Sequence, residues 1–169
     1  MNKTYYVCKY TPVEVFEAMG VEIRRIQPEV TNFNQADTLM HPNICSFTKS
    51  VLEDVLAGDY EGVVLTTCCD SIRRLYDVLK QQCPDKFLYL LDVPRKVNDF
   101  STDMYRENIL DMVHAYEAFS GKTFDEIVLK QLLERREAGQ NLRTAPKNNA
   151  SVHIGLMGAR CSKGIIDLL

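Results

Sequence analysis

The sequence has no long hydrophobic run, no concentration of positive charge and no leader-like N-terminus. A helix that spans a bilayer needs about 20 consecutive apolar residues. No segment approaches that length, so we expect no membrane association. The formal net charge of −3 predicts no broad basic surface for nucleic acid. The first six residues lack the apolar region and cleavage site of a signal peptide, so we expect a cytoplasmic protein.

Two common cofactor motifs are also missing. The sequence contains no C-x-x-C pair and no compact run of cysteines of the ferredoxin type. Its glycines at positions 155, 158 and 164 do not form the G-x-G-x-x-G pattern, so a dinucleotide site is not predicted. A cofactor site in this chain would therefore be built from residues that lie far apart in the sequence.

What the chain does contain is an alternation of strand-like and helix-like segments. Strands are expected at 5–8, 21–26, 62–67 and 87–91. Helices are expected from a capping box at 11–14 to Gly20, from Pro42 to Ala57, around 72–79, and on both sides of Gly121, with a polar loop at 28–37. This alternation predicts an α/β fold with a parallel sheet.

The C-terminal part differs in composition from the rest. Residues 1–138 form the predicted N-terminal α/β domain with a helical extension, and the polar residues 139–150 are expected to be a linker. Residues 152–157 then resemble a new strand. A strand with a few helical residues cannot bury its own apolar face. Residues 151–169 are therefore interpreted as the beginning of an incomplete second α/β domain.

Six cysteines stand at positions 8, 45, 68, 69, 83 and 161. In a reducing compartment they are expected to be metal ligands, catalytic thiols or core residues rather than disulfides. Cys68 and Cys69 lie where a predicted strand passes into a helix, and Cys45 lies just before another helix. Helix N-termini stabilise thiolates, and helix starts on one sheet edge can bring them together. Converging thiolates select iron–sulfur clusters, zinc or copper(I).

Each cysteine also has a simpler interpretation as an inert core residue. Adjacent residues point in different directions, so one of Cys68 and Cys69 is expected to face the site. Cys83, after a helix, is expected to be structural. Cys8 follows a strand and would also face the sheet edge, although a structural role is the commoner one for such a thiol.

Four charged or titratable residues near these cysteines have two interpretations each. His41 is close to Cys45 and would contact a ligand or, more commonly, cap its own loop. Asp70 would act in catalysis or, as the preferred interpretation, cap the helix that follows Cys69. Arg73 and Arg74 would contact the phosphates of a ligand or an acidic partner, or form a solvated helix face.

Four segments in register, at 6–14, 41–47, 67–74 and 91–96, resemble the 2-hydroxyacyl-CoA dehydratase family. This family also includes benzoyl-CoA reductase subunits and double-cubane cluster proteins. The resemblance covers most of residues 4–135. It implies a Rossmann-like parallel sheet flanked by helices, in an enzyme with two such domains.

The resemblance also implies a cofactor and partners. Family members bind a [4Fe-4S] cluster through cysteines from both domains, and Cys45 and Cys69 match the first two ligands. The third ligand of the family lies in the C-terminal domain. An ATP-dependent activator ATPase delivers a low-potential electron for radical dehydration of an acyl-CoA. A homologous second subunit, in a homo- or heterodimer, and oxygen sensitivity are implied as well.

Cys68 is an addition to the simple dehydratase pattern. A Cys-Cys pair here resembles the double-cubane branch, in which an [8Fe-9S] cluster serves ATP-driven reduction of small molecules. In that case Cys68 would join Cys45 and Cys69 as a ligand. The sequence is also compatible with a truncated non-catalytic module that binds a partner, and with a zinc or thiol-redox protein.

Overall fold

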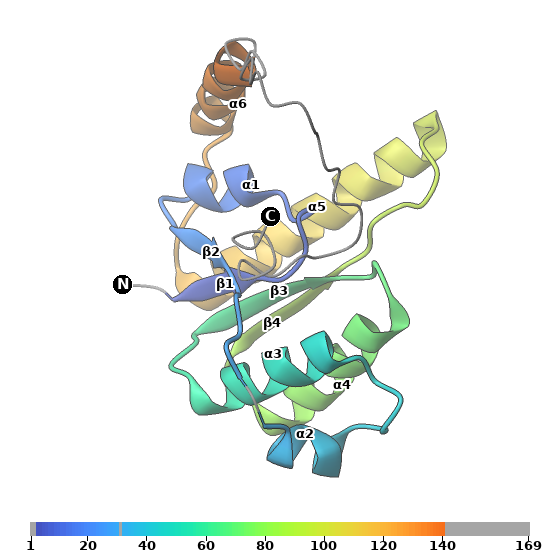
Figure 1. Cartoon of the computed structure of the whole chain (residues 1–169). Coiled ribbons are helices and arrows are strands. Elements are labelled where there is room, and N and C mark those ends of the chain that lie inside the picture. The colour runs from blue at the N-terminus through green and yellow to red at the C-terminus, as the bar shows by residue number, and fades with distance from the viewer. Residues whose placement is uncertain (1–2, 31, 141–169) are drawn as a thin grey trace, which may run out of the picture. The chain divides into compact units, whose positions relative to one another are not determined.

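The structure is a computed structural model that describes residues 3–30 and 32–140, and its strands and helices alternate along the chain (Figure 1). The strands are β1 (Thr4–Tyr6), β2 (Ile23–Arg25), β3 (Gly62–Thr66) and β4 (Phe87–Leu91). The helices are α1 (Val13–Ala18), α2 (Asn34–Leu39), α3 (Ser46–Ala57), α4 (Asp70–Gln82), α5 (Asp99–Ser120) and α6 (Glu126–Gln140). The predicted strands and most of the predicted helices are confirmed.

The four strands form one parallel sheet in the order β2-β1-β3-β4. β3 is paired with β4 along its whole length, from Gly62 opposite Phe87 to Thr66 opposite Leu91. All five residues of β3 are buried, which explains why this strand is an unbroken apolar run rather than an alternating one. The predicted α/β fold with a parallel sheet is therefore confirmed.

Helices cover both faces of the sheet (Figure 1). Alternate residues of β3 face opposite layers. Val63 and Leu65 belong to the core that α3 and α4 complete, whereas Val64 belongs to the core beneath α1 and α5. In the second core the Tyr116 ring packs edge-on against Phe16, with 5.0 Å between ring centroids. These two cores fix the helix starts relative to the ends of the strands.

Two local predictions were wrong. The capping box at 11–14 does not form, because Pro12 is the N-cap of α1 without a side-chain bond. The Thr11 hydroxyl is buried and has no hydrogen-bond partner among the described residues. The predicted loop at 28–37 contains the first residues of α2. Glu53 Oε1, on α3, accepts the backbone N–H groups of Gln35 and Ala36 at 2.7 and 2.8 Å. A tertiary contact, which local sequence does not reveal, therefore holds the start of α2.

The predicted break at Gly121 is confirmed. This glycine ends α5 with φ of 70°, a left-handed conformation that glycine adopts at little cost. None of the helices in the described ranges has the length and apolarity that crossing a membrane requires. The predicted second domain at 151–169 lies outside the described residues, as does the predicted linker apart from its first two positions.

Candidate functional site

The carboxyl ends of the two central strands carry three of the cysteines. Cys8 follows β1, and Cys68 and Cys69 follow β3. From β1 the chain moves to one side of the sheet to form β2, and β3 and β4 lie on the other side. The gap between β1 and β3 is therefore the topological switch point, where open α/β sheets bind their ligands.

Cys45 and Cys69 occupy equivalent positions at two helix starts. Cys45 is the N-cap of α3, and Cys69 is the N-cap of α4. Both side chains are exposed. The first turn of each helix leaves backbone N–H groups free, and the helix dipole is positive there. Both positions therefore favour a bound anion.

The surroundings of Cys45 stabilise its thiolate form. Partial burial raises the pKa of this thiol, but hydrogen bonds from the Thr48 and Ser71 side chains and from backbone groups of Phe47 and Thr48 outweigh it. The pKa of Cys45 is consequently below its usual value. Its Sγ lies 3.1 Å from Thr48 Oγ1. A thiol with a lowered pKa is a better nucleophile and a better metal ligand at neutral pH.

Ser71 links the two helix starts. It lies in the first turn of α4, two residues after Cys69, and its side chain contacts the Cys45 thiol. The helices α3 and α4 also pack in the same core. The structure therefore brings Cys45 to the beginning of the helix whose N-cap is Cys69.

Cys68 has a different environment. Burial is the main cause of its raised pKa; the Thr66 hydroxyl acts in the opposite direction, and the neighbouring thiols of Cys8 and Cys69 add to the rise. The contact with Cys8 spans β1 and β3 at the switch point. From local sequence a structural role is the commoner interpretation of Cys8, because local sequence does not reveal the order of the strands. Cys8 lies beside Cys68 because β1 and β3 are neighbours in the sheet.

The described thiols form an incomplete ligand set. Across residues 3–30 and 32–140, no three His, Cys, Asp or Glu side chains are arranged so that they could hold a metal ion. Exposed thiols at two helix N-termini nevertheless fit a thiophilic, negatively charged cofactor in donor type and in local field. Further ligands would have to come from outside the described residues.

The remaining predicted residues have simple roles. His41 Nδ1 accepts the backbone N–H of Asn43 at 3.2 Å, which is the loop-capping role. Asp70 is not a cap, because Cys69 occupies that position and Asp70 is the first residue of α4, where its charge suits the helix dipole. Cys83 is buried in the core, as predicted.

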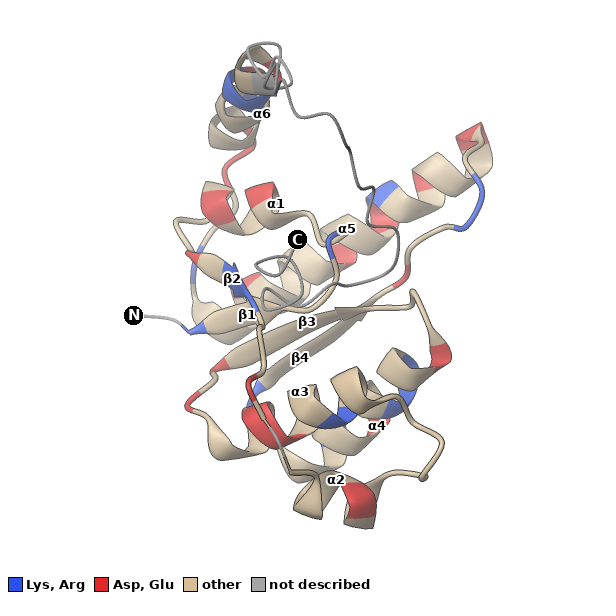
Figure 2. Ribbon diagram, viewed as in Figure 1, with Lys and Arg blue, Asp and Glu red and all other residues tan. Residues whose placement is uncertain are grey.

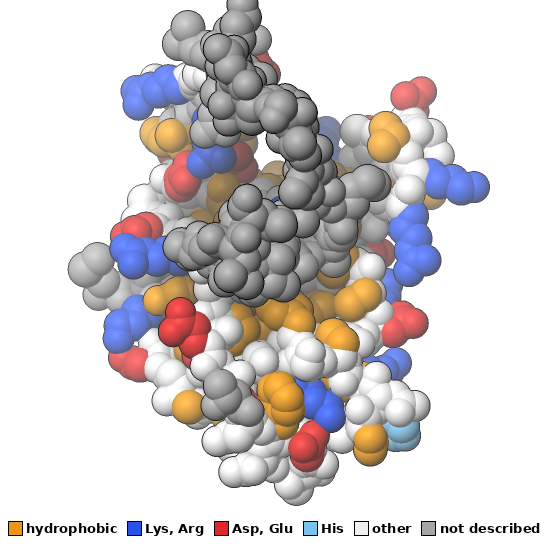
Figure 3. Space-filling view, in the orientation of Figure 1, with side chains coloured by type: hydrophobic (Ala, Val, Ile, Leu, Met, Phe, Trp, Pro, Cys, Tyr) orange, Lys and Arg blue, Asp and Glu red, His pale blue; other side chains and the backbone are white. Residues whose placement is uncertain are grey.

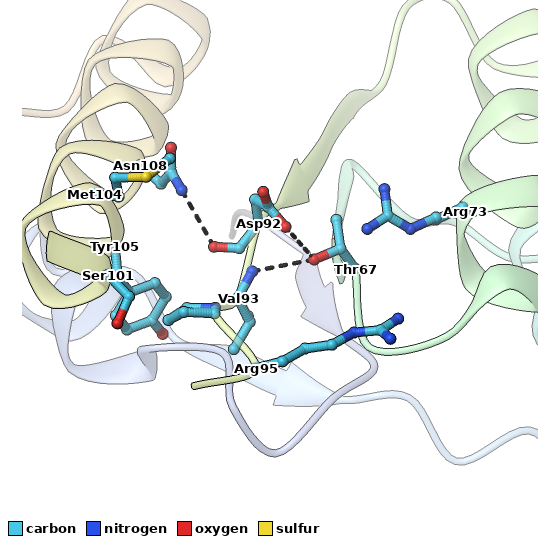
Figure 4. Close-up of a pocket in the computed structure, with 10 residues that line it drawn as sticks. Thr67, Arg73, Asp92, Val93, Arg95, Ser101, Met104, Tyr105 and Asn108 are labelled. Atoms are coloured by element: carbon cyan, nitrogen blue, oxygen red, sulfur yellow. Dashed lines mark hydrogen bonds between the residues drawn. The ribbon is translucent and has the colours of Figure 1, made fainter. Parts of the chain in front are cut away.

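Two adjoining pockets lie along the same edge, between α4 and the loop from β4 to α5. Their volumes are about 260 and 650 Å³, and they share Thr67, Arg95 and Tyr105 in their linings. The larger pocket reaches Cys68. Figure 4 shows the smaller one, in which the Thr67 hydroxyl donates to Asp92 and accepts the backbone N–H of Val93 at 3.1 Å.

The two neighbouring arginines of α4 are separated by the structure. Arg73 is half-buried and lines the smaller pocket. Arg74 is exposed and pairs with Asp77 at 2.9 Å. Only Arg73 therefore faces the candidate site, and Arg74 belongs to a solvated helix face.

A parallel α/β domain with thiols and a pocket at its switch point defines a class of ligand- or cofactor-binding domain. The family model of the 2-hydroxyglutaryl-CoA dehydratase D-component matches residues 8–149. This chain belongs to that family. It is also similar to the (R)-phenyllactyl-CoA dehydratase beta subunit of Clostridium sporogenes, with 27% identity over 133 residues. That alignment covers 74% of this chain and 34% of the relative, so the chain spans about a third of the relative's length.

Proposed function

We propose that this chain is an iron–sulfur subunit of a 2-hydroxyacyl-CoA dehydratase-like enzyme, with Cys45 and Cys69 as cluster ligands. The observation that carries the proposal is the Cys45 thiol at the N-cap of α3, in contact with the first turn of α4, where Cys69 is the N-cap. Membership in the dehydratase family supports the same assignment.

The residues at this edge would have distinct tasks. Backbone N–H groups at both helix starts would stabilise the thiolates and the negative charge of a [4Fe-4S] cluster. Such a cluster would supply a low-potential electron for removal of water from a 2-hydroxyacyl thioester. The pocket beside Cys68 would hold the acyl-CoA and exclude water from it.

Two kinds of partner follow from this proposal. An ATP-dependent activator ATPase would deliver the electron, and a homologous subunit would complete the enzyme. The relative is itself named as a beta subunit, which supports a multi-subunit assembly. The exposed free thiols at the proposed site fit a reducing compartment such as the cytoplasm. The proposed cluster would be sensitive to oxygen, which fits an anaerobically growing cell.

A double-cubane-type reductase, which would carry an [8Fe-9S] cluster, is the second candidate. Cys68 favours this candidate, because it is a third thiol besides Cys45 and Cys69, the two positions of the simple dehydratase pattern. Cys68 adjoins Cys69 in the sequence and contacts Cys8. In such a reductase Cys68 would be a third ligand from this chain, and the product would be a reduced small molecule.

Anaerobic reconstitution of the chain with iron, sulfide and 2-mercaptoethanol tests the proposal, because the small thiol can occupy iron positions that the described residues do not fill. We expect a brown protein that contains iron and acid-labile sulfide, and Cys45→Ser and Cys69→Ser should each lose most of both. Cys83→Ala is the matched control, since Cys83 is buried away from the site and this variant should retain the cluster. A colourless, iron-free wild-type protein would refute the proposal. Zinc without sulfide would favour a zinc protein.

Cys68→Ser separates the two candidates. A single-cluster dehydratase subunit should keep its iron and sulfide in this variant. A double-cubane protein should bind about twice as much iron as a single [4Fe-4S] cluster holds, and Cys68→Ser should reduce that amount.

A further inference from the structure

The two adjoining pockets together form a groove that begins at Cys68, and positive charge is concentrated at its other end. Arg73 and Arg95 line the smaller pocket, and Lys96 lines the larger one. Among the described residues of the two linings, these three cations face a single carboxylate, that of Asp92. Figure 2 shows basic residues both on α4 and in the loop between β4 and α5. The whole chain, by contrast, has a net charge of −3.

The two guanidinium groups have no protein partner within the ranges that the structure describes. Neither Arg73 nor Arg95 makes an ion pair or a side-chain hydrogen bond there. Arg74, the neighbour of Arg73, is by contrast paired with Asp77. Arg73 comes from α4 and Arg95 from the loop after β4, and Figure 4 places both side chains beside Thr67. Two unpaired guanidinium groups that meet at one pocket attract an anion.

The carboxylate of Asp92 is held by its own neighbours. It accepts the Thr67 hydroxyl, and Asn108 Nδ2 donates to the Asp92 carbonyl oxygen at 3.3 Å. These bonds fix the start of the loop that carries Arg95. Asp92 offsets one of the three positive charges, which leaves the groove with a positive balance.

The groove has a less polar part next to this cationic end. The larger pocket, of about 650 Å³, is lined by Tyr10, Val93 and Val97 and extends to Cys68. Its size lies in the range of ordinary small-molecule sites. In Figure 3 basic side chains lie along the molecular edge that holds the loop between β4 and α5, with hydrophobic side chains beside them.

We infer that Arg73 and Arg95 together bind an oxyanion, a phosphate or a carboxylate, of a ligand whose less polar part lies along the groove toward Cys68. A planar guanidinium presents paired donors that match two oxygens of either group. This inference deepens the proposed function and rests on it for the choice of ligands. The oxyanion is then either a phosphate of the coenzyme or a carboxylate of the acyl group.

Calorimetric titration of the iron-free full chain tests this inference. Butyryl-CoA is the phosphate source, glutarate is the carboxylate source, and butyryl-pantetheine is the reference without either group. We expect at least one anionic ligand to bind more tightly than the reference. Arg73→Gln and Arg95→Gln should each weaken that binding by about tenfold or more, since hydrogen bonds to charged groups are the strong ones.

Arg74→Gln is the matched control. It removes the same charge at the next residue, whose side chain pairs with Asp77 instead of lining the pocket. Its affinity should equal that of the wild type. Equal binding by all three variants, or no binding of either anion, would overturn the inference. Preference for butyryl-CoA or for glutarate identifies the source of the oxyanion. Iron and sulfide uptake should be unchanged in Arg73→Gln, so failure of the anion site and failure of the cluster proposal are distinguishable.

Discussion

Two exposed cysteines at this edge differ in acidity although both lie near a helix start. Cys45 receives hydrogen bonds from Thr48 and Ser71, which lower the pKa of its thiol despite partial burial. Cys68 is surrounded by other thiols, and burial together with their negative charge raises its pKa. A nearby hydrogen-bond donor favours the charged form, whereas a nearby anion disfavours it.

The alkylation rates of individual cysteines should reflect this difference. In the iron-free protein, the pH–rate profile of Cys45 with iodoacetamide should have its midpoint below the usual cysteine value, and that of Cys68 above it, because only the thiolate reacts. Mass spectrometry of the labelled peptides measures both rates in one sample. At neutral pH Cys45 should therefore react first.

Thr48→Val provides a direct check of the cause. It removes the hydroxyl 3.1 Å from Cys45 Sγ, so the midpoint of Cys45 should rise while that of Cys68 stays unchanged. Thr38→Val, at an exposed hydroxyl that bonds Asn34 in α2, is the control and should shift neither. Equal midpoints for Cys45 and Cys68 in the wild type would contradict the explanation.

At the scale of elements, the turn from β3 to α4 is bonded to the loop from β4 to α5, which lines both pockets. Thr66 and Thr67 are both buried at its start. The Thr67 hydroxyl bonds Asp92 and the backbone N–H of Val93, and thereby holds the end of β4. The Thr66 hydroxyl has no nitrogen or oxygen partner among the described residues.

The two threonines should consequently differ in their contribution to stability. Thr67→Val leaves the Val93 N–H without its partner and should lower the free energy of unfolding by about 1–3 kcal/mol. Thr66→Val removes a hydroxyl that lacks such a partner and should change it by less than about 0.5 kcal/mol. Urea denaturation followed by circular dichroism measures both. A larger loss in Thr66→Val than in Thr67→Val would show that these bonds are misassigned.

For the molecule as a whole, the described part offers thiols but not a full ligand set. Cys45 and Cys69 begin two helices, and within residues 3–140, apart from Thr31, no three suitable side chains are arranged as a metal site. The chain also spans only 34% of the phenyllactyl-CoA dehydratase beta subunit. A cluster bound by this chain should therefore depend on thiolates from elsewhere.

Added small thiols should compensate for the missing ligands. After reconstitution and desalting, the chain should retain more iron and sulfide in the presence of 2-mercaptoethanol than in its absence, because a small thiolate can occupy an open position on iron. The same comparison with 2-propanol controls for solvent effects. Identical retention with and without the thiol would indicate that the chain supplies a complete ligand set by itself.

The sequence by itself determined most of the elements, though not α2, and the residue types at the site. The apolar run at 62–66 indicated a buried strand, and the periodicity after Asp70 indicated the helix that follows. The position of Cys45 and Cys69 before helices could be inferred in the same way, because helix starts have local signals. Four segments in register also sufficed to recognise the family.

Only the tertiary structure decided which of these residues meet. The contact between Cys8 and Cys68 depends on β1 and β3 being neighbours, and the start of α2 depends on Glu53 from α3. Likewise, the choice between Arg73 and Arg74 depends on which side of α4 packs beside the loop after β4. Strand order and packing involve residues far apart in the chain, whereas local patterns report only on near neighbours.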